Sequence, residues 1–433
     1  MKFKYKELDQ ISLNSLQIIF IKGFGIILSY GLTLFLTNYF SEKSVGEFNF
    51  SNNILLIFGT ICLFGANQSI YQIGGKMKGV QSLFYLKKIY FKFLLISFYI
   101  FLIILITVLI IPEKFYDIVF NKPDVYSLTM KTILYVFIYA LTIINFEMLR
   151  ILKFIKTSEL FRSVFRPIVF FIAAVVVYFI GKSYLLVDIF LFSFLVIAIV
   201  STAIILKKIK QAGIKQEEDN ESYSIKNIFI VSLPMAVSAL SLLLMQSIDS
   251  FFIIKYYSYA ELAYYAIAIK LTVLITVVLT SINTVIAPEI SKSYFENNFV
   301  NLKEVIYKSS RINFIFTIPL LLILVVFSDF ILNMFGENYV VAKVALIVLC
   351  VGQFVSSYCG SVGLYLNMTG KQKQFFLLLL ISLALNFLLN FILIPKYGIN
   401  GAAISSSFSL IFWNIVGLIY IYKVDKVKTY FRR

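Results

Sequence analysis

Three ionisable side chains stand inside long apolar runs of this sequence, at Lys22, Asp249 and Lys270. A lysine or aspartate at the centre of a membrane-spanning helix costs about 2.5–3.5 kcal/mol, so such residues are retained where they are paired or line a watery cavity. A lysine in a cavity binds an anion, whereas a carboxylate there holds a cation or a proton. Lys22 has no acidic residue at matching depth in its own half of the chain, and we therefore expect it to contact an anionic substrate.

Asp249 and Lys270 allow two interpretations. Their expected depths, about 10 Å and about 13 Å below the outer ends of consecutive helices, would let them meet as a structural ion pair. A paired lysine can still exchange partners with an anionic ligand, so Lys270 remains a candidate substrate contact. Asp249 is the one deep carboxylate that the sequence places in the expected spans. It is therefore the candidate carrier of a coupling proton or sodium ion, and no deep carboxylate is expected in the N-terminal six helices.

Neutral polar residues share the helix faces of these charges. Hydroxyl residues follow Lys22 at helical spacing, asparagines occupy one face of the second apolar run, and an amide precedes Asp249 by one turn. The pattern predicts a polar cavity whose substrate-binding residues are Lys22, Lys270, Asn53, Gln246, Ser29 and Thr33. Hydroxyl and small residues in membrane helices also mediate helix packing, which remains the alternative for each serine and threonine. Asn386 and Asn390, stacked at four-residue spacing, predict hydrogen bonds between helices.

The sequence lacks the residues that several kinds of chemistry require. Histidine is absent. The three cysteines, Cys62, Cys350 and Cys359, lie in apolar runs, so we expect them to be small packing residues. Gly181-Lys182-Ser183 ends like a phosphate-binding loop, but Val176 stands where the first glycine is required. There is no Asp-x-Asp pair to hold a metal-bound sugar nucleotide. We therefore expect no enzyme, no cofactor and no bound metal.

The elements that must position these residues are membrane helices. The chain has 433 residues, of which 60% are hydrophobic and 14% charged, with a mean hydropathy of +0.90. Soluble domains are about 45–50% apolar and about 25% charged. Long apolar runs separated by short charged stretches indicate an all-α membrane protein of about twelve transmembrane helices. The expected spans are 13–39, 48–73, 89–111, 128–150, 160–180, 184–206, 227–256, 262–288, 311–334, 340–366, 374–394 and 400–422.

The basic residues predict the orientation of these spans. Of the 39 lysines and arginines, 28 lie in the terminal segments and in alternate loops, one of which runs from Arg150 to Arg166, and only 8 lie in the opposite loops. The rule that positive loops face the cytoplasm puts both termini there. The net charge of +17 is thereby explained without a nucleic-acid partner.

An internal repeat predicts two lobes. The longest polar stretch, 207–226, divides the chain into an N-terminal lobe (1–206) and a C-terminal lobe (227–433) of six helices each. An offset of 217 residues aligns Tyr39-Phe40-Ser41 with Tyr256-Tyr257-Ser258. Because six is even, the two halves run parallel, as in transporters that bind substrate between repeats.

The chain resembles the polysaccharide-transport flippases, which bind lipid-linked O-antigen or capsular repeat units and belong to the superfamily of multidrug and toxic-compound extrusion (MATE) transporters and lipid II flippases. The resemblance covers almost the whole length. It is sharpest at Leu233-Pro234 through Ser247-Ile248-Asp249, at Ala287-Pro288-Glu289-Ile290, and at Ile394-Pro395-Lys396-Tyr397-Gly398-Ile399-Asn400-Gly401-Ala402-Ala403. In the last run Pro395 ends a helix, Gly398 makes a turn, and Gly401 lets the next helix start in close contact.

This resemblance implies a MATE-like V of two lobes, open alternately to the two sides of the membrane. It implies an undecaprenyl-pyrophosphate-linked oligosaccharide as substrate, and a monomer in the bacterial inner membrane that has the membrane lipid and other polysaccharide-assembly proteins as partners. In lipid II flippases, cationic residues on helices 1, 2 and 8 line the cavity. Lys22 and Lys270 match helices 1 and 8, while helix 2 has only asparagines. An ion-coupled multidrug or cation antiporter of the same fold is the alternative, followed by a membrane enzyme of polysaccharide assembly.

Overall fold

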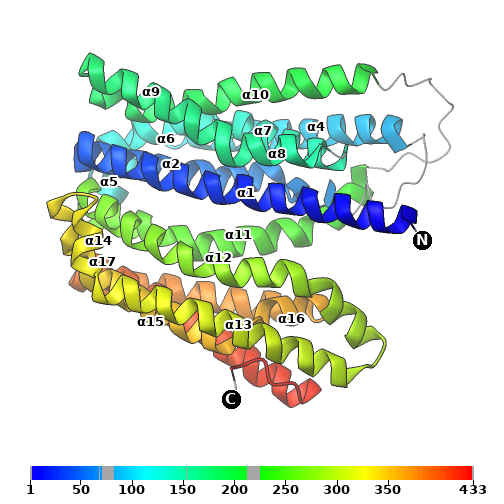
Figure 1. The fold of residues 1–433 in the computed structure, drawn as a ribbon. Helices are drawn as coiled ribbons and strands as arrows, with labels where there is room; N and C mark the ends of the chain where they lie inside the picture. Colours follow the sequence, from blue (N-terminus) through cyan, green and yellow to red (C-terminus); the bar gives the residue numbers. More distant parts are fainter. Residues whose placement is uncertain (1, 68, 71–81, 153, 212–224, 432–433) are drawn as a thin grey trace. The chain divides into compact units, whose positions relative to one another are not determined.

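The regular structure of this chain is helical. The computed structural model describes residues 2–67, 69–70, 82–152, 154–211 and 225–431, and every regular element in these ranges is a helix (Figure 1). Ten helical segments of the described residues are long and apolar enough to cross a membrane. The chain is therefore a multi-pass membrane protein, as its composition predicts.

The described residues of the twelve expected spans fall on helices, apart from short turns. Two of them are not counted separately among the ten segments. α2 (Glu42–Leu63) carries several asparagines, which lower its hydropathy. α17 (Gln372–Asp425) is 54 residues long and contains two spans, because its backbone is non-helical at Gly398.

The chain divides into two compact units, Met1–Leu240 and Ser241–Arg433. The expected linker, 207–226, falls largely outside the described residues, so the lobe boundaries of 1–206 and 227–433 stay predictions. The helix α11 (Ile225–Tyr256) contains the boundary between the units. Its first half belongs to the N-terminal unit, where the Ser232 hydroxyl donates to the Ser69 hydroxyl at 2.8 Å.

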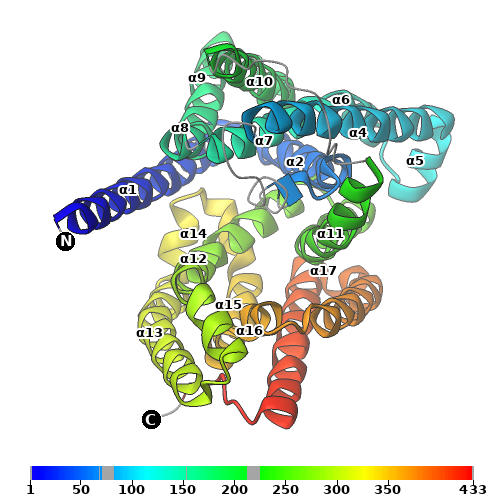
Figure 2. The same ribbon diagram turned by 90° about the vertical axis from the view of Figure 1, so that its right-hand side faces the viewer.

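The N-terminal unit consists of long helices packed along one another, with short elements at their ends (Figures 1 and 2). Its elements after α1 (Lys2–Tyr39) and α2 are α4 (Ser82–Ile110), α5 (Glu113–Phe120), α6 (Asp124–Leu134), α7 (Val136–Ile151), α8 (Ile155–Leu160), the π-turn η1 (Phe161–Phe165), α9 (Arg166–Ile180), η2 (Ser183–Leu185) and α10 (Leu186–Gln211). α8, η1 and α9 form one continuous span, Ile155–Ile180.

Arg162 and Arg166 lie on this helical segment and inside the expected span 160–180, although the charge count grouped them with the loop from Arg150 to Arg166. The orientation derived from that count stays a prediction. Arg162 can lie in the helix because a carboxylate of α7 pairs with it, as described below.

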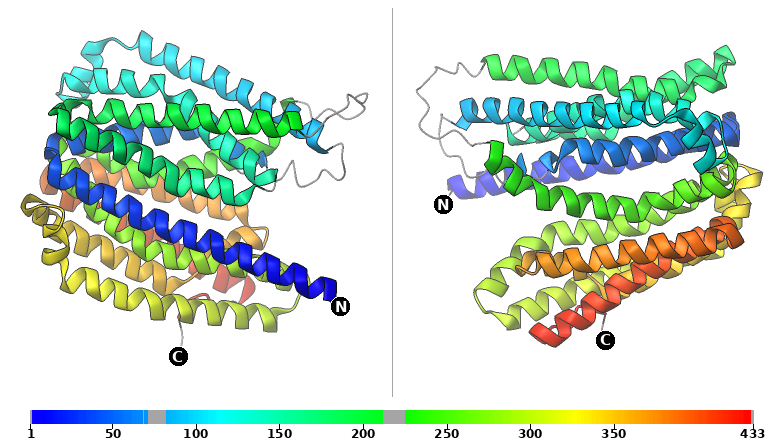
Figure 3. Two further views of the ribbon diagram at one scale, coloured as in Figure 1. Left: turned by 45° about the horizontal axis from the view of Figure 1, so that its top comes forward. Right: turned by 180° about the vertical axis from the view of Figure 1, so that it is seen from behind.

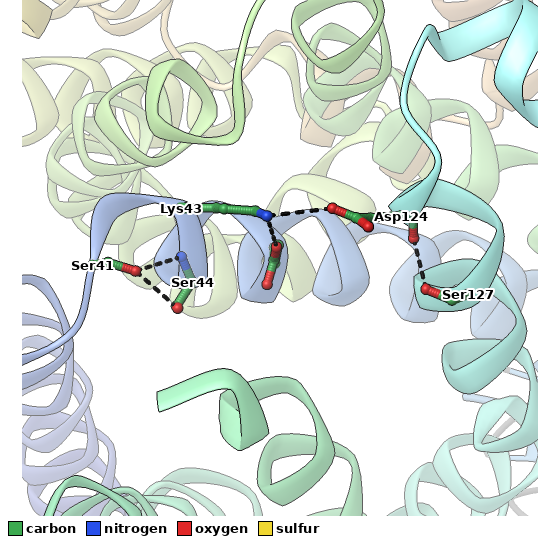
Figure 4. A network of polar contacts seen from close by, with 6 residues as sticks. Ser41, Lys43, Ser44, Asp124 and Ser127 are labelled. Atoms are coloured by element: carbon green, nitrogen blue, oxygen red, sulfur yellow. Dashed lines mark hydrogen bonds and ion pairs between the residues drawn. The ribbon is translucent and has the colours of Figure 1, made fainter. Parts of the chain in front are cut away.

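Polar contacts fix the beginning of α2 within the N-terminal unit. The Ser41 hydroxyl caps α2 by accepting a hydrogen bond from the Ser44 amide at 3.2 Å. The Lys43 ammonium bridges Glu47 at 3.6 Å and Asp124, at the start of α6, at 3.3 Å (Figure 4). These contacts hold the first turns of α2 and α6 together.

The C-terminal unit contains the second half of α11, α12 (Tyr259–Phe295), α13 (Phe299–Val326), α14 (Ser328–Asn333), η3 (Glu337–Ala342), α15 (Lys343–Cys359), α16 (Val362–Met368) and α17. Gly398 has φ 54°, a conformation that favours glycine, and it separates the two halves of α17, which Figure 3 draws in orange and red. A Cβ atom added at Gly401 would lie 2.4 Å from the carbonyl oxygen of Leu393. The expected turn at Gly398 and the close start of the next helix at Gly401 are therefore confirmed.

Candidate functional site

Asp249 is the centre of a buried polar cluster in the C-terminal unit. Its side chain comes from α11 and is 1% exposed. One carboxylate oxygen, Oδ2, accepts hydrogen bonds from the Tyr265 hydroxyl of α12 at 2.6 Å and from the Ser406 hydroxyl of α17 at 2.5 Å. The other, Oδ1, accepts one from the Asn390 amide at 2.5 Å. Three helices of this unit therefore converge on one carboxylate through neutral donors.

The two asparagines beside Asp249 leave polar atoms unsatisfied. The Asn390 amide also donates to Asn386 Oδ1 at 3.1 Å, within α17. The expected hydrogen bonding between helices is therefore confirmed for Asn390, through its bond to Asp249, and stays a prediction for Asn386. Asn390 Oδ1 and Asn386 Nδ2 are buried and have no hydrogen-bond partner. A buried amide oxygen without a partner costs about 1–3 kcal/mol, which a bound ion or water would recover.

The chemistry of this cluster suits a small cation. The described residues contain no group of three or more His, Cys, Asp or Glu side chains that could hold a metal ion. With a single carboxylate, the cluster matches a proton or a monovalent cation in charge.

The other predicted residues of the C-terminal unit lie differently. Gln246 is exposed although it precedes the buried Asp249 by three residues, so the two side chains do not share one environment. Lys270 is half-buried on α12, five residues after Tyr265. The hydrogen bonds to the Asp249 carboxylate come from tyrosine, serine and asparagine, and the pair between Asp249 and Lys270 stays a prediction.

Lys22 lies on an exposed part of α1 that is anchored nearby. Three residues later, a Cβ atom added at Gly25 would lie 2.5 Å from the carbonyl oxygen of Ser163, so α1 touches the η1 backbone there. Further along α1, the Thr33 hydroxyl donates to the carbonyl oxygen of Ser29 at 2.8 Å. The face shared by these residues therefore includes a packing contact as well as the lysine. Asn53 is half-buried on α2.

An ion network that the sequence did not predict lies beside this contact. Glu147 of α7, whose side chain is 3% exposed, pairs with Arg150 at 3.3 Å and forms a very short contact with Arg162. Glu159 of α8 pairs with Arg150 at 3.7 Å. The expectation for the N-terminal six helices concerned depth in the membrane and not burial, so it stays a prediction although Glu147 is buried. It lies four residues before the end of α7, about 6 Å along the axis, and arginines neutralise it.

Arg166 is a cation of the same unit without a carboxylate partner. It lies one helical turn before Phe170 and two turns before Ala174, which are buried, so it shares the inward face of α9. Its guanidinium lies 4.5 Å from the centroid of the Phe194 ring, and no ion pair among the described residues includes it. A cation–π contact is worth about 0.5–2 kcal/mol.

Two bundles of membrane helices, each with buried ionisable residues and no enzyme-like constellation among the described residues, are typical of a membrane transporter. The family described as "Polysaccharide biosynthesis protein" matches residues 12–294, and the chain belongs to this family. The MatE family matches residues 234–392, which contain the Asp249 cluster except for Ser406.

Known proteins are similar to this chain in sequence and in fold. The probable low-salt glycan biosynthesis flippase Agl15 of Haloferax volcanii is 28% identical over 146 residues, which cover 34% of this chain and only 31% of that protein. The structure of the lipid II flippase MurJ, in an inward closed conformation, matches with a TM-score of 0.73 and 17% identity, covering 94% of this chain and 87% of that one. An inward-facing multidrug resistance MATE family transporter of the MOP superfamily matches with a TM-score of 0.68 and 16% identity, covering 92% and 93%.

These matches confirm the family resemblance and the two-lobe fold. The chain is a multi-pass membrane protein of the polysaccharide biosynthesis protein family, and its fold is that of the similar flippase and transporter structures. Its relatives are transporters and flippases rather than enzymes.

Proposed function

We propose that this chain translocates an undecaprenyl-pyrophosphate-linked oligosaccharide repeat unit across the bacterial inner membrane, for O-antigen or capsule assembly, by alternating access. The observation that carries this proposal is the charge of the N-terminal unit. Its buried carboxylates, Glu147 and Glu159, are both paired with arginines, while Arg166 has no carboxylate partner. The network is therefore cationic overall and favours an anionic head group.

The same charge distribution argues against the export of organic cations. An exporter of cations binds them through carboxylates that are open to the ligand. Glu147 would have to give up two arginines before it could bind one, and breaking a buried pair typically costs about 3–5 kcal/mol. The cation antiporter remains the second candidate because the Asp249 cluster could serve such a transporter equally well.

Lys22 and Lys270 are the proposed contacts of the substrate pyrophosphate, and Asn53, Gln246, Ser29 and Thr33 are proposed to line its path. At an effective dielectric constant near 20, a lysine about 4 Å from a phosphate charge contributes about 4 kcal/mol of Coulomb attraction before desolvation. Lys22 lies near the contact of α1 with η1, and Lys270 lies in the outer half of α12. The two lysines would act in sequence as the transporter changes its open side.

Asp249 is the proposed site of ion coupling. A proton or sodium ion on its carboxylate would satisfy the unpaired amide oxygen of Asn390 or remove the charge from the membrane interior. Either event changes the hydrogen bonds that join α11, α12 and α17.

Both termini are proposed to face the cytoplasm, with the 207–226 segment as the linker between the lobes. A single cysteine at position 215 should react with a membrane-impermeant maleimide only after the cells are opened. Labelling of intact cells at this position would overturn the orientation.

Export of polysaccharide by variants tests the function. In a deletion strain, wild-type protein should restore the surface polysaccharide, Lys22→Gln and Lys270→Gln should restore little of it at equal protein level, and Lys→Arg at either position should restore most. A deletion strain with normal polysaccharide but raised sensitivity to cationic drugs would establish the antiporter instead. If Lys270→Gln regains export when combined with Asp249→Asn, the two residues form a structural pair and Lys270 does not bind substrate.

A further inference from the structure

A short helix in each unit connects two membrane spans and leaves an apolar face uncovered. α5 lies between the spans Leu86–Ile110 and Asp124–Ile151 (Figure 2). α14 lies in the same way between the spans Phe299–Val326 and Glu337–Cys359. Each connection to a span has three residues or fewer, which reach about 10 Å at most. Both helices are therefore kept at the boundary of the membrane.

The two sides of α5 differ in what they contact. On one side, Tyr116 is buried and its ring centroid lies 5.4 Å from that of Tyr126 in α6. The other side carries Phe115 and Ile118, which are 52% and 77% exposed. Lys114 is also exposed and lies one turn before Ile118, at the edge of this side. α5 is therefore an amphipathic helix with a lysine beside its uncovered apolar face.

α14 is divided in the same way. Leu332 is buried, whereas Phe330, two residues earlier and so on the opposite side of the helix, is 68% exposed. Phe327 and Met334, which flank α14, are exposed on the same side as Phe330 at helical spacing. An offset of 215 residues aligns Phe115 with Phe330, so the internal repeat places a phenylalanine on both uncovered faces.

The apolar surface of a neighbouring span continues into the face of α14. Ile323, near the end of α13, is exposed one turn before Phe327. The Phe327 amide donates to the carbonyl oxygen of Ile323 at 3.0 Å, and the Ile331 amide donates to that of Phe327 at 2.9 Å, so the helical path is continuous. Exposed apolar side chains of a membrane span face lipid. The same lipid therefore meets the exposed face of α14.

We propose that α5 and α14 are anchor helices that lie in the membrane interface, with Phe115 and Phe330 inserted among the acyl chains of one leaflet and Lys114 at its head groups. The described residues contain six candidate spans between the two helices, an even number, which predicts that both meet the same leaflet. Amphipathic helices of this kind insert their apolar face roughly 5–10 Å into the boundary between head groups and acyl chains. The anchors hold each unit at a fixed level in the membrane.

Tryptophan fluorescence of the full-length protein in lipid vesicles tests the anchors. Trp413 is the only tryptophan of the sequence, so Trp413→Phe removes the native emission. In this background, Phe115→Trp and Phe330→Trp place a probe on each face, at exposed positions where the packing of the unit is kept. Phosphatidylcholine brominated in the upper part of its acyl chains should quench most of the emission of both variants. The same lipid brominated near the chain ends should quench less.

Glu113→Trp in the same background is the matched control. Glu113 is exposed and lies two residues before Phe115, on the opposite side of α5. Iodide in the water should quench this variant, and brominated lipid should quench it much less than Phe115→Trp.

The alternative positions of the two faces give different results. Quenching of Phe115→Trp and Phe330→Trp by iodide instead of brominated lipid would place both faces in water and overturn the anchors. Protection from both quenchers would mean that a second copy or another protein covers the faces, which also overturns the lipid contact. Stronger quenching by bromine near the chain ends would make the helices parts of the spans and not interfacial anchors. Quenching of only one variant would overturn the anchor in the other unit.

Discussion

Gly25→Ala should destabilise the N-terminal unit, because α1 has no room for a methyl group where it meets η1. The new Cβ atom would lie 2.5 Å from the carbonyl oxygen of Ser163 and 2.6 Å from Ser163 Cβ. Carbon and oxygen atoms in contact normally lie about 3.3 Å or more apart, so α1 must retreat by roughly 0.8 Å. The obstructing atom is backbone, which cannot move away alone. Overpacking of this kind typically costs about 1–3 kcal/mol.

The same helix provides two matched controls. Nothing lies within 4 Å of a Cβ atom added at Gly23 or at Gly31. Alanine is better than glycine in a helix by up to about 1 kcal/mol, so Gly23→Ala and Gly31→Ala should leave stability unchanged or raise it. The measurement is the free energy of unfolding in mixed micelles, followed by circular dichroism during titration with dodecyl sulfate.

A second measurement links this contact to function. Since Lys22 lies three residues from Gly25, displacement of α1 should also lower polysaccharide export by Gly25→Ala, whereas the two controls should export normally. Gly25→Ala with the stability of Gly23→Ala would show that α1 does not pack on Ser163, and the placement of Lys22 near η1 would be refuted.

Two further changes test other contacts. Tyr265→Phe removes the hydroxyl that donates to Asp249 and should lower the free energy of unfolding by about 1.5–3 kcal/mol. The control, Tyr397→Phe at an exposed position, should leave this free energy unchanged. Equal stabilities of the two variants would contradict the hydrogen bond. Burial alone lowers the pKa of Lys371, which directly precedes α17, but its ion pair with Asp425, the last residue of α17, at 2.8 Å contributes to a net rise in this pKa. The raised pKa makes this contribution to stability complete below pH about 10.4, the unfolded value, and lost as pH rises through the folded pKa. The thermal midpoint of the wild type should therefore fall above that pH more steeply than that of Lys371→Met, and parallel curves would refute the linkage.

Hydropathy and turn residues were enough to predict the fold. Each apolar run became a helix because a membrane leaves the backbone no other partner for its hydrogen bonds. The turn at Gly398 followed from its neighbours in the sequence, Pro395 and Gly401, since a proline and two glycines cannot continue a packed helix at low cost. Such features are local, and local sequence determines them.

The candidate site could be predicted only in part, because its contacts join distant residues. Asp249 was visible as a carboxylate in an apolar run, but Ser406 is one of three consecutive serines, and only the register of α17 selects it. Arg166 was hidden for a different reason. The charge count grouped this arginine with a loop, and the pairing of nearby Arg162 with Glu147, fifteen residues earlier, is a tertiary contact that the sequence does not display.

The helix α12 offers a physical route by which a coupling ion at Asp249 could act on Lys270, the proposed substrate contact. Tyr265 donates to Asp249, and Lys270 follows on the same helix about 7.5 Å along its axis. A cation or proton on the carboxylate weakens the attraction that holds the Tyr265 hydroxyl, and so changes how firmly α12 is held to α11. Linkage is reciprocal: if ion binding raises the affinity for the lipid pyrophosphate by some factor, lipid binding raises the affinity for the ion by the same factor. A transporter built in this way needs no direct contact between the ion and its substrate, only a helix that both of them hold.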